Sequence, residues 1–548
     1  MKAFATLIMG MLLVAAVAGT VSGAEEEDTC AVLFDFGNGQ VMWADVPVAE
    51  GMNAFNVTVD AATKLGLIIT SINYGSGSSP NMFIDTVDGL GAKEDYSEFW
   101  GTWTWNSTIN SWAMNNGLSS ISAGSGMAFA LRYAPLEDSP LANPDNRYPW
   151  TCCRYDYWST GQQTDANLSN ITLRWSKNLN NGPIDAPIIG ANGQIYVMTG
   201  GVYGKTNSVL YCYNLAGEEI WNATIGAAGY QIATPLLYNA IIIVPSANGK
   251  LYSFFTSNGT AAWLPFDTGF SGTNGINTSP IKYLDRIILA AGNGTLYSIN
   301  ANDGTPYQAP VNTSKVYAPS LSIYNGIVFI GDEVGNISAL DANSLGELWS
   351  TRVGEKVRSS PLVDVENNQV VITYTEASRG GIAGVNMSTG DILWQTTIGS
   401  SPSSVSVTSE GFVSLTLDGL VMVSHEGDTL WNLPLNMEYT GASPTVVGDK
   451  IFALTNEDSS RLVAVDLTGK LISETILTPA NYAMCSPTFI DDFLFMASDN
   501  GYVYAFSTGS APIPPADPEA FPWMLVGGLA AVIVIAAVGL VYWRGKKA

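Results

Sequence analysis

Short apolar strands and turn residues recur in a fixed order along residues 186–508. Each copy begins with a small residue before a proline. An apolar strand, a second strand with a Leu-Tyr type pair, a turn glycine and usually a tryptophan follow, most clearly from Ser360 to Trp394. The marker prolines are Pro187, Pro235, Pro280, Pro319, Pro361, Pro402, Pro444 and Pro487. They span 300 residues with a mean period of about 43, which is typical of one four-stranded propeller blade.

The strands within the copies are apolar on both faces, as in residues 240–246 (AIIIVPS), 326–332 (GIVFIGD) and 450–456 (KIFALTN). A strand with one face in water would alternate between apolar and polar residues. Strands that are covered on both faces read as continuous apolar runs. The pattern therefore predicts blades that stack against a neighbour on each side.

An outer strand that carries a tryptophan ends most copies, and we expect each indole to dock into the gap between adjacent blades. These tryptophans are Trp175, Trp221, Trp263, Trp349, Trp394 and Trp431. Tyr307 and Ile472 take the same place in the third and seventh copies. Truncation of such a tryptophan to alanine is predicted to cost about 3–5 kcal/mol.

The eighth copy stops before any tryptophan strand, whereas a surplus strand, Ile171–Trp175, precedes the first copy. We predict that this strand completes the eighth blade, because closure removes an open edge that would template aggregation. The predicted fold class is mainly β, with an eight-bladed β-propeller over residues 149–508.

The repeats resemble the propellers of the pyrroloquinoline-quinone (PQQ) dehydrogenase type. The segment before the first copy is similar to the strap that leads into quinoprotein-like propellers. Its matching residues are Trp150, Arg154, Asp156, Thr160 and Gly161, followed by Trp175. The resemblance implies a quinoprotein-like fold and makes PQQ-dependent dehydrogenation a function to be tested.

Residues 28–135 read as a separate unit of strands around one short helix near Ala61–Leu65. The segments VTVDAATKLGL, FIDTVDGLGA, FWGTWTWNSTINSW and ISAGSGMAFALRY resemble the β-grasp-like domain at the C-terminus of cobalamin carriers such as transcobalamin. That resemblance implies a small α+β domain. Residues 136–148 are rich in breaker residues and are predicted to be a linker. Trp100, Trp103, Trp105 and Trp112 form either part of the domain core or a platform for a flat ligand.

Both ends of the chain are hydrophobic. Residues 1–24 are predicted to be a signal peptide, with Ser22 and Ala24 as the small residues before the cleavage site. Residues 509–520 read as a proline-rich stalk. Residues 521–543 are uncharged and long enough for one transmembrane helix, and residues 544–548 form a basic cytoplasmic tail. We therefore expect a single-pass protein of the cell membrane with a large extracellular N-terminal portion.

Acidic residues dominate the chain, which has a formal net charge of −25. This charge excludes nucleic acid and anionic lipid as expected partners. Eleven Asn-x-Ser/Thr sequons are candidates for glycosylation: Asn56, Asn106, Asn167, Asn170, Asn222, Asn258, Asn277, Asn293, Asn312, Asn336 and Asn386. Together with the predicted signal and membrane span, they suggest an archaeal cell-surface glycoprotein.

Candidate catalytic chemistry is sparse. Quinoprotein dehydrogenases use a bound calcium ion, a catalytic Asp and often a vicinal disulfide over the cofactor. The adjacent Cys152 and Cys153 lie in the strap, and no insertion between blades carries a set of Asp, Glu and Asn. We predict no catalytic, cofactor-binding or metal-binding residue, and PQQ or calcium binding remains the rival. His425, the single histidine, is expected in an exposed turn and excludes His-rich metal sites.

Five cysteines in an exported chain leave an odd thiol. Cys30 is expected to form a disulfide with Cys152 or Cys153, and a vicinal disulfide between Cys152 and Cys153 is the alternative. Cys212 and Cys485 lie on apolar strands and are expected to be buried thiols.

The sequence thus predicts a membrane-anchored surface binding or interaction protein with a non-catalytic propeller. Its expected partner is an extracellular protein, a glycan or a small ligand. One alternative is a PQQ-dependent dehydrogenase. The other is an envelope assembly scaffold similar to the propeller lipoprotein of bacterial outer-membrane assembly, which has this repeat and no cofactor.

Overall fold

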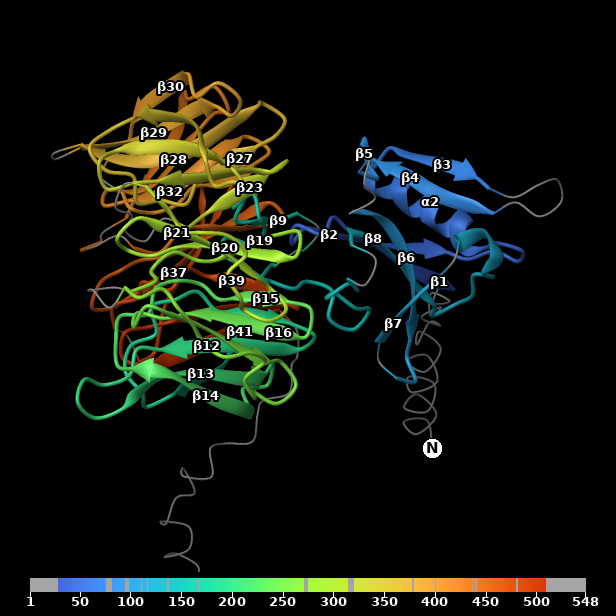
Figure 1. Cartoon of the computed structure of the whole chain (residues 1–548), viewed down its shortest axis with the longest axis horizontal. Coiled ribbons are helices and arrows are strands. Elements are labelled where there is room, and N and C mark those ends of the chain that lie inside the picture. The colour runs from blue at the N-terminus through green and yellow to red at the C-terminus, as the bar shows by residue number, and fades with distance from the viewer. Residues whose placement is uncertain are drawn as a thin grey trace, which may run out of the picture.

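The computed structural model describes residues 28–508 except 75–80, 94–97, 110, 116, 136–137, 165, 167, 271–274, 314–319, 377–378, 400, 436, 439–440 and 480. It contains a disc of β-sheets with a smaller N-terminal unit against one face of the disc (Figure 1). The predicted signal peptide, stalk, membrane span and tail lie outside the described residues. Within the described part, no helix has the length and apolarity needed to cross a membrane.

A mixed five-stranded sheet forms the main layer of the N-terminal unit, in the order β2-β1-β8-β6-β7. Its strands are β1 (Thr29–Asp35), β2 (Val41–Pro47), β6 (Phe99–Asn106), β7 (Ser111–Met114) and β8 (Ala128–Ala134). The first and last of these strands in the chain, β1 and β8, are parallel neighbours at its centre. A smaller sheet has the order β3-β4-β5, with β3 (Ile69–Asn73), β4 (Met82–Val87) and β5 (Leu90–Gly91).

One helix, α2 (Ala54–Leu65), packs against the five-stranded sheet and contacts β2 and β1. It begins before the predicted Ala61, because Asn53 and Asn56 form a reciprocal capping box at its N-terminus. Gly66 ends it in the left-handed conformation. Val57 and Ala61 are buried with Phe34 in the core of the unit, and a 3-10 turn, η1 (Leu118–Ser120), lies beside it.

Each of the first seven repeats folds as one antiparallel sheet whose four strands lie in chain order. The first four sheets are β11 (Ile189–Ala191), β12 (Gln194–Thr199), β13 (Asn207–Asn214), β14 (Glu219–Ala227); β15 (Leu236–Tyr238), β16 (Ile241–Pro245), β17 (Lys250–Phe255), β18 (Phe266–Asp267); β19 (Ile281–Tyr283), β20 (Arg286–Ala290), β21 (Thr295–Asn300), β22 (Val311–Asn312); and β23 (Ser322–Tyr324), β24 (Ile327–Gly331), β25 (Asn336–Asp341), β26 (Glu347–Arg352).

The next three sheets are β27 (Leu362–Asp364), β28 (Gln369–Glu376), β29 (Arg379–Asn386), β30 (Ile392–Thr397); β31 (Ser406–Thr408), β32 (Gly411–Thr416), β33 (Gly419–Val423), β34 (Thr429–Pro434); and β35 (Thr445–Val447), β36 (Lys450–Leu454), β37 (Arg461–Asp466), β38 (Leu471–Ile476). A short strand, β9 (Gln162–Gln163), pairs in parallel with β35.

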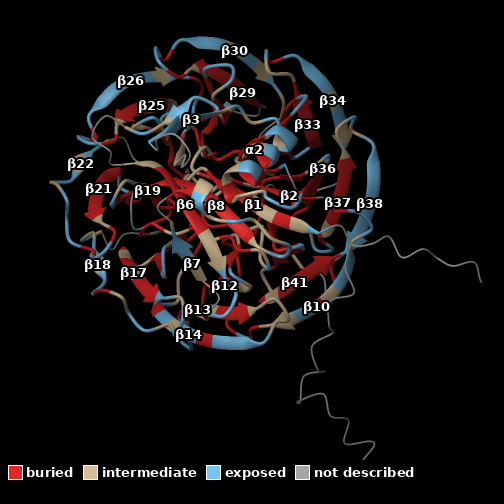
Figure 2. Ribbon diagram, turned by 90° about the vertical axis from the view of Figure 1, so that its right-hand side faces the viewer, coloured by how far each residue is buried: buried red, intermediate tan, exposed pale blue. Residues whose placement is uncertain are grey.

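The last repeat supplies only β39 (Thr488–Ile490), β40 (Phe493–Ala497) and β41 (Tyr502–Ser507). The N-terminal strand β10 (Thr172–Asn178) pairs with β41 and is the fourth strand of this sheet, as expected for the surplus strand. Figure 2 shows the outer strands of the sheets, from β14 to β38 and β10, around the rim of the disc.

Burial within the sheets follows the apolar pattern of the sequence. All residues of β16, β20 and β40 are buried, whereas the outer strands β26 and β34 alternate between exposed and half-buried residues. Figure 2 shows the same change from buried inner strands to an exposed rim. The inner strands are apolar on both faces because a neighbouring sheet covers each face.

Serine hydroxyl groups connect successive sheets close to their inner strands. The backbone N–H groups of Thr234, Ser279, Ser320, Ser360, Ser404 and Ser443 donate to the hydroxyl groups of Ser279, Ser320, Ser360, Ser404, Ser443 and Ser486, respectively, at 2.8–3.3 Å. Four of these acceptors are the small residue directly before the marker proline. The repeat keeps a small hydroxyl residue there because it satisfies a buried N–H group of the preceding sheet.

Candidate functional site

Residues 149–163, here called the strap, cross the inner strands of six sheets. Backbone hydrogen bonds join the strap to Gly190, Leu237, Ile323, Val363, Val407 and Val446. Gly448, in the turn between β35 and β36, also donates its N–H to the carbonyl of Gln163. The strap therefore lies at the end of the disc that carries the turns between the first and second strands of the sheets.

Asp156 organises the strap. One carboxylate oxygen accepts from the backbone N–H groups of Trp158 and Thr160, both at 3.0 Å. The other accepts from the Thr160 hydroxyl at 2.6 Å and from the Gln40 amide at 3.0 Å. Burial raises the pKa of Asp156 to about 6, although these hydrogen bonds oppose the shift.

Arg154 ties the strap to the sixth sheet. Its Nη2 donates to the carbonyl of Val405 at 3.1 Å and to the hydroxyl of Ser406. Burial lowers the pKa of the guanidinium to about 10. Gly161 approaches this guanidinium so closely that a Cβ atom would lie 2.1 Å from Nη2. The residues that resemble the quinoprotein strap therefore bind the chain to itself.

The hairpin turn between β1 and β2 rests on the strap. The carbonyl of Asn38 accepts the N–H of Tyr157 at 2.8 Å, and the Tyr155 hydroxyl accepts the N–H of Val41 at 3.3 Å. Gly39 has a φ of +103°, and a Cβ atom there would lie 2.9 Å from the Tyr155 carbonyl oxygen. A glycine is needed at this contact for both reasons.

A buried ionic network joins the N-terminal unit to the third sheet. Arg132 binds Asp35 at 2.6 Å and Asp138 at 3.2 Å, and Lys282 binds Asp138 at 3.0 Å. Burial alone would raise the pKa of Asp138, but the charges of Arg132 and Lys282 lower it. Removal of one member would leave a buried charge without its partner. The predicted linker, residues 136–148, is thus part of a packed junction rather than a free connection.

The opposite end of the sheets carries the turns between the second and third strands, here called the open face. Tyr203, Val334 and Leu417 are exposed in three of these turns. Arg358 and Glu333 form an ion pair at 2.7 Å next to Val334. Exposed apolar side chains on loops held by a rigid scaffold are typical of binding surfaces. The open face is therefore the candidate partner-binding site.

The six tryptophans expected between blades lie against turn glycines of the next sheet. A Cβ atom added to Gly217, Gly259, Gly304, Gly390, Gly427 or Gly469 would lie 2.5–3.1 Å from the indole of Trp175, Trp221, Trp263, Trp349, Trp394 or Trp431, respectively. All six glycines have positive φ. Four of the indole N–H groups, those of Trp175, Trp221, Trp349 and Trp431, donate to a backbone carbonyl of that sheet.

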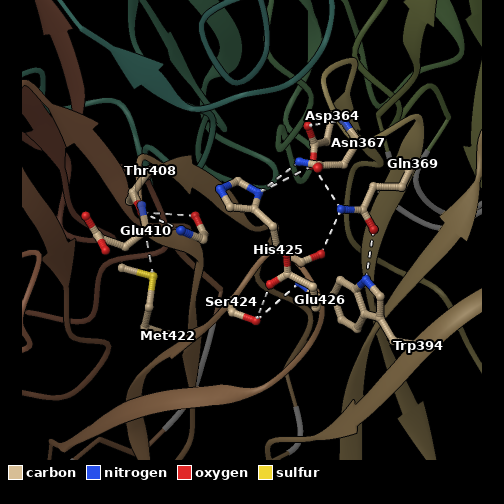
Figure 3. A network of polar contacts seen from close by, with 11 residues as sticks. Asp364, Asn367, Gln369, Trp394, Thr408, Glu410, Met422, Ser424, His425 and Glu426 are labelled. Carbon is tan, nitrogen blue, oxygen red and sulfur yellow. Dashed lines mark hydrogen bonds and ion pairs between the residues drawn. The ribbon is translucent and has the colours of Figure 1, made fainter.

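His425 is half-buried, which corrects its expected exposure in a turn. Its Nδ1 lies 3.4 Å from Asp364, and its ring makes an edge contact with Phe412 at 4.9 Å between centroids. Gln369 donates to Asp364 and to the carbonyl of His425, and it accepts the N–H of Trp394 (Figure 3). The hydrogen bond to Asp364 raises the pKa of His425. This network connects the fifth and sixth sheets.

All five cysteines are free thiols, so both expected disulfide pairings are wrong. Cys30 is buried in the core of the N-terminal unit, where its thiol donates to the carbonyl of Gly124. Cys152 packs in the cluster of the second and third sheets, away from that core. Burial raises the pKa values of Cys152, Cys212 and Cys485.

One sequon conflicts with the fold, because Asn277 is only 2% exposed and cannot accept a glycan in this structure. Asn167 lies outside the described residues. Asn56, Asn106, Asn170, Asn222, Asn258, Asn293 and Asn312 are exposed, and Asn336 and Asn386 are half-buried. Glycosylation at these positions stays a prediction.

The four tryptophans of the N-terminal unit pack against other parts of the protein. Trp100 and Trp103 are buried. Trp105 and Trp112 are half-buried and make an edge contact at 5.3 Å between centroids, and Trp112 donates to the carbonyl of Ala142. The second pair therefore packs against the junction and offers no free flat platform.

A calcium-bound quinone would need a convergent set of carboxylate and amide donors. Among the residues that the structure describes, no three His, Cys, Asp or Glu side chains converge in a way that could hold a metal ion. The carboxyl groups of Asp185 and Asp499 lie close together between the first and eighth sheets. Burial and then the charge of Asp499 raise the pKa of Asp185 to about 7. The donor set does not fit calcium and PQQ, and the absence of a cofactor stays a prediction.

Comparison with known proteins identifies related propellers. The profile of the family described as outer membrane protein assembly factor BamB matches residues 169–318 and 308–510. An outer membrane protein assembly factor BamB from Yersinia pestis is 22% identical over 371 residues, which are 64% of this chain and 78% of the relative.

Two solved structures show the same fold. BamB from Moraxella catarrhalis has a TM-score of 0.51 at 17% identity, over 63% of this chain and 99% of that one. A europium-containing methanol dehydrogenase has a TM-score of 0.52 at 10% identity, over 66% of this chain and 98% of that one. At these identities the likeness extends to the PQQ-like propeller fold and not to chemistry.

The relatives also correct the expected localisation. The Yersinia pestis protein is named for the outer membrane, so the expectation of a single-pass protein with an extracellular portion in the cell membrane is wrong. These two relatives come from Yersinia pestis and Moraxella catarrhalis, and they give no support to the predicted archaeal origin.

Proposed function

This chain belongs to the outer membrane protein assembly factor BamB family, and we propose that it is a non-catalytic scaffold that binds other proteins of an envelope assembly complex. The observation that carries the proposal is the family match, which extends over almost the whole disc of sheets. This function was the second alternative from the sequence, and it replaces the membrane-anchored surface binding or interaction protein as the main interpretation.

We further propose an eight-bladed propeller that is closed by β10. Pairing of β10 with β41 supports this proposal, because it joins a strand that precedes the first repeat to the last repeat. Side-chain packing also supports the closure, because Trp175 of β10 contacts Gly217 of the first sheet. We also infer that the N-terminal unit is β-grasp-like, because β1 and β8 are parallel at the centre of its sheet and α2 follows the first hairpin.

The open face is the surface that we assign to partner binding. The N-terminal unit, the junction and the strap occupy the other face through buried contacts, so a partner cannot reach the inner strands there without displacing them. Tyr203, Val334 and Leu417 are available on the open face, and the chain has a formal net charge of −25. We therefore expect a protein partner with apolar side chains in a basic surrounding.

Site-specific crosslinking tests this proposal. A photoreactive residue at Val334 should crosslink to a defined envelope assembly protein in cells, and the same residue at Ile392 on the exposed rim should not. The triple variant Tyr203→Ser, Val334→Ser and Leu417→Ser should lose the partner and lower the amount of assembled outer-membrane proteins. Normal assembly of outer-membrane proteins in cells that lack the chain would refute the proposal. Retention of PQQ with dye-linked alcohol oxidation by the purified chain would support the enzyme instead.

A further inference from the structure

The small sheet of the N-terminal unit has an open edge. Its order is β3-β4-β5, so β3 has one neighbour and one free side. The burial pattern of β3 is one half-buried residue followed by four exposed residues. Figure 1 shows β3 at the top of the N-terminal unit and apart from the disc, whereas β5, at the other edge of the small sheet, accepts hydrogen bonds from Trp100 and Tyr133 of the five-stranded sheet. The disc of sheets therefore leaves β3 accessible.

Hydrogen bonding in the sheet shows which backbone groups point outward. Ile68 accepts from the N–H of Asp88 at 2.7 Å, and Tyr74 donates to the carbonyl of Asn81 at 3.0 Å. Backbone groups of successive residues alternate between the two sides of a strand. The groups of Ile68, Thr70, Ile72 and Tyr74 thus face β4. The backbone N–H and carbonyl groups of Ile69 and Ser71 face the free side. No described backbone group forms a hydrogen bond with them on that side.

The side chains beside this edge are apolar and exposed. Ile68, Thr70, Ile72 and Tyr74 lie on one face of the strand because side chains alternate. Ile68 and Tyr74 are 72% and 70% exposed, and Tyr74 contacts Phe83 of β4 edge-on at 5.5 Å. An added strand would extend this apolar row and bury part of it.

Edge strands normally carry protection against such pairing, such as lysine, proline or inward-pointing charges. The sequence of β3, ITSIN, contains none of these residues. Its one irregularity is a register shift against β4 between Thr70 and Ser71, on the side away from the free edge. The edge is therefore left able to pair.

The acidic surroundings of β3 indicate the charge of a segment that could pair with it. Asp88 accepts the N–H of Ile68, and Asp85 accepts from the Thr70 hydroxyl, so carboxylates lie along the strand. Residues 28–135 contain ten acidic and three basic residues. A segment with lysine or arginine at its ends would complement this charge, and an acidic one would be repelled.

We propose that β3 is a second docking surface, separate from the open face, where an extended and basic segment of another polypeptide adds one strand to the sheet. Backbone hydrogen bonds from Ile69 and Ser71 would give the affinity, and the row of Ile68, Ile72 and Tyr74 would select apolar side chains at alternate positions.

The probe is a fluorescent peptide of sequence Lys-Thr-Val-Thr-Val-Thr-Tyr-Lys, titrated into the purified full chain. Ser71→Pro removes the outward N–H group and leaves the hydrogen bonds to β4, since proline is tolerated on a free edge. We expect at least tenfold weaker binding. Ser71→Thr keeps the N–H group and should bind like the native chain, and circular dichroism checks that both variants fold.

A second arm leaves the protein unchanged. The same peptide is made with N-methyl groups on either the odd or the even residues, so that each version loses the N–H groups of one edge. One of the two versions should lose binding, because its methylated edge is the one that pairs with β3. Replacement of both lysines by aspartate should also weaken binding. Absence of binding to the native chain would overturn the proposal, as would binding that neither Ser71→Pro nor N-methylation changes. The triple variant of the open face should bind the peptide normally, which separates this test from that of the proposed function.

Discussion

Truncation of Trp221 to alanine tests whether the indoles hold neighbouring sheets together. Trp221 lies on β14 and is only 8% exposed. It contacts the turn glycine Gly259, and its N–H donates to the carbonyl of Thr256 of the next sheet at 2.8 Å. Tyr196 and Phe254 pack beside it with ring centroids at 5.8 and 6.5 Å. The variant therefore loses contacts to both sheets at one seam.

The magnitude follows from these contacts. Burial of a tryptophan removes roughly 150–250 Å² from water, and truncation of a buried aromatic costs about 3–5 kcal/mol. A lost hydrogen bond contributes about 1 kcal/mol of that cost. Tyr307 occupies the same repeat position in the third sheet but is 52% exposed, with its ring beside Arg286. Tyr307→Ala should therefore cost less than about 1 kcal/mol.

Urea denaturation of the purified chain, followed by circular dichroism, gives both values from the shift of the midpoint and the slope. We expect a large shift for Trp221→Ala and a small shift for Tyr307→Ala. Equal shifts for the two variants would refute the seam argument. A smaller slope for Trp221→Ala alone would indicate that the sheets had begun to unfold separately.

Two pH-dependent effects follow from buried groups. Burial and the charge of Asp499 raise the pKa of Asp185 to about 7, above its ordinary value, so the stability that neutral Asp185 contributes is lost as the pH rises from about 4 through 7. The thermal midpoint of Asp499→Asn should fall less than that of the native chain between pH 5 and pH 8, and an identical pH profile would contradict the pairing. Asp364 raises the pKa of His425, so the stabilisation by this pair is complete below about pH 6.5 and is lost as the pH rises through the higher pKa of the folded state. His425→Gln should cost roughly 0.5–1 kcal/mol at pH 5.5 and less at pH 9 by urea denaturation, and a cost that is independent of pH would argue against the ion pair.

The repeat architecture was predictable because local and long-range signals agree in it. Apolar runs, marker prolines and turn glycines recur with the period of one sheet, and each strand pairs with the next one in the chain. The missing strand of the eighth repeat also left a countable surplus, which is β10. The start of α2 was missed because its cap is formed by two asparagines rather than by the commoner serine and glutamate.

The junction was not predictable from the sequence. Asp35, Arg132, Asp138 and Lys282 are separated by up to 247 positions in the chain, and each looks like an ordinary surface charge until the fold brings them together. The breaker residues in 136–148 suggested a free linker, because the sequence does not show that Asp138 lies between Arg132 and Lys282. Disulfides were predicted because cysteines of an exported chain often pair. In the structure, Cys30 and Cys152 lie in different hydrophobic cores.

The strap shows how a chain can have the quinoprotein-like fold without the chemistry of a quinoprotein. The strap residues that resemble those of quinoproteins form contacts within the protein. Asp156 has all its carboxylate contacts within the strap and with Gln40 of the N-terminal unit, and Arg154 binds the sixth sheet. A carboxylate that accepts four hydrogen bonds inside the protein is poorly placed to coordinate a metal ion or to take a substrate proton. These polar residues therefore stabilise the closed side of the disc. The open face and the edge of β3 are therefore the surfaces that we assign to binding, because the side chains and backbone groups named there extend into solvent.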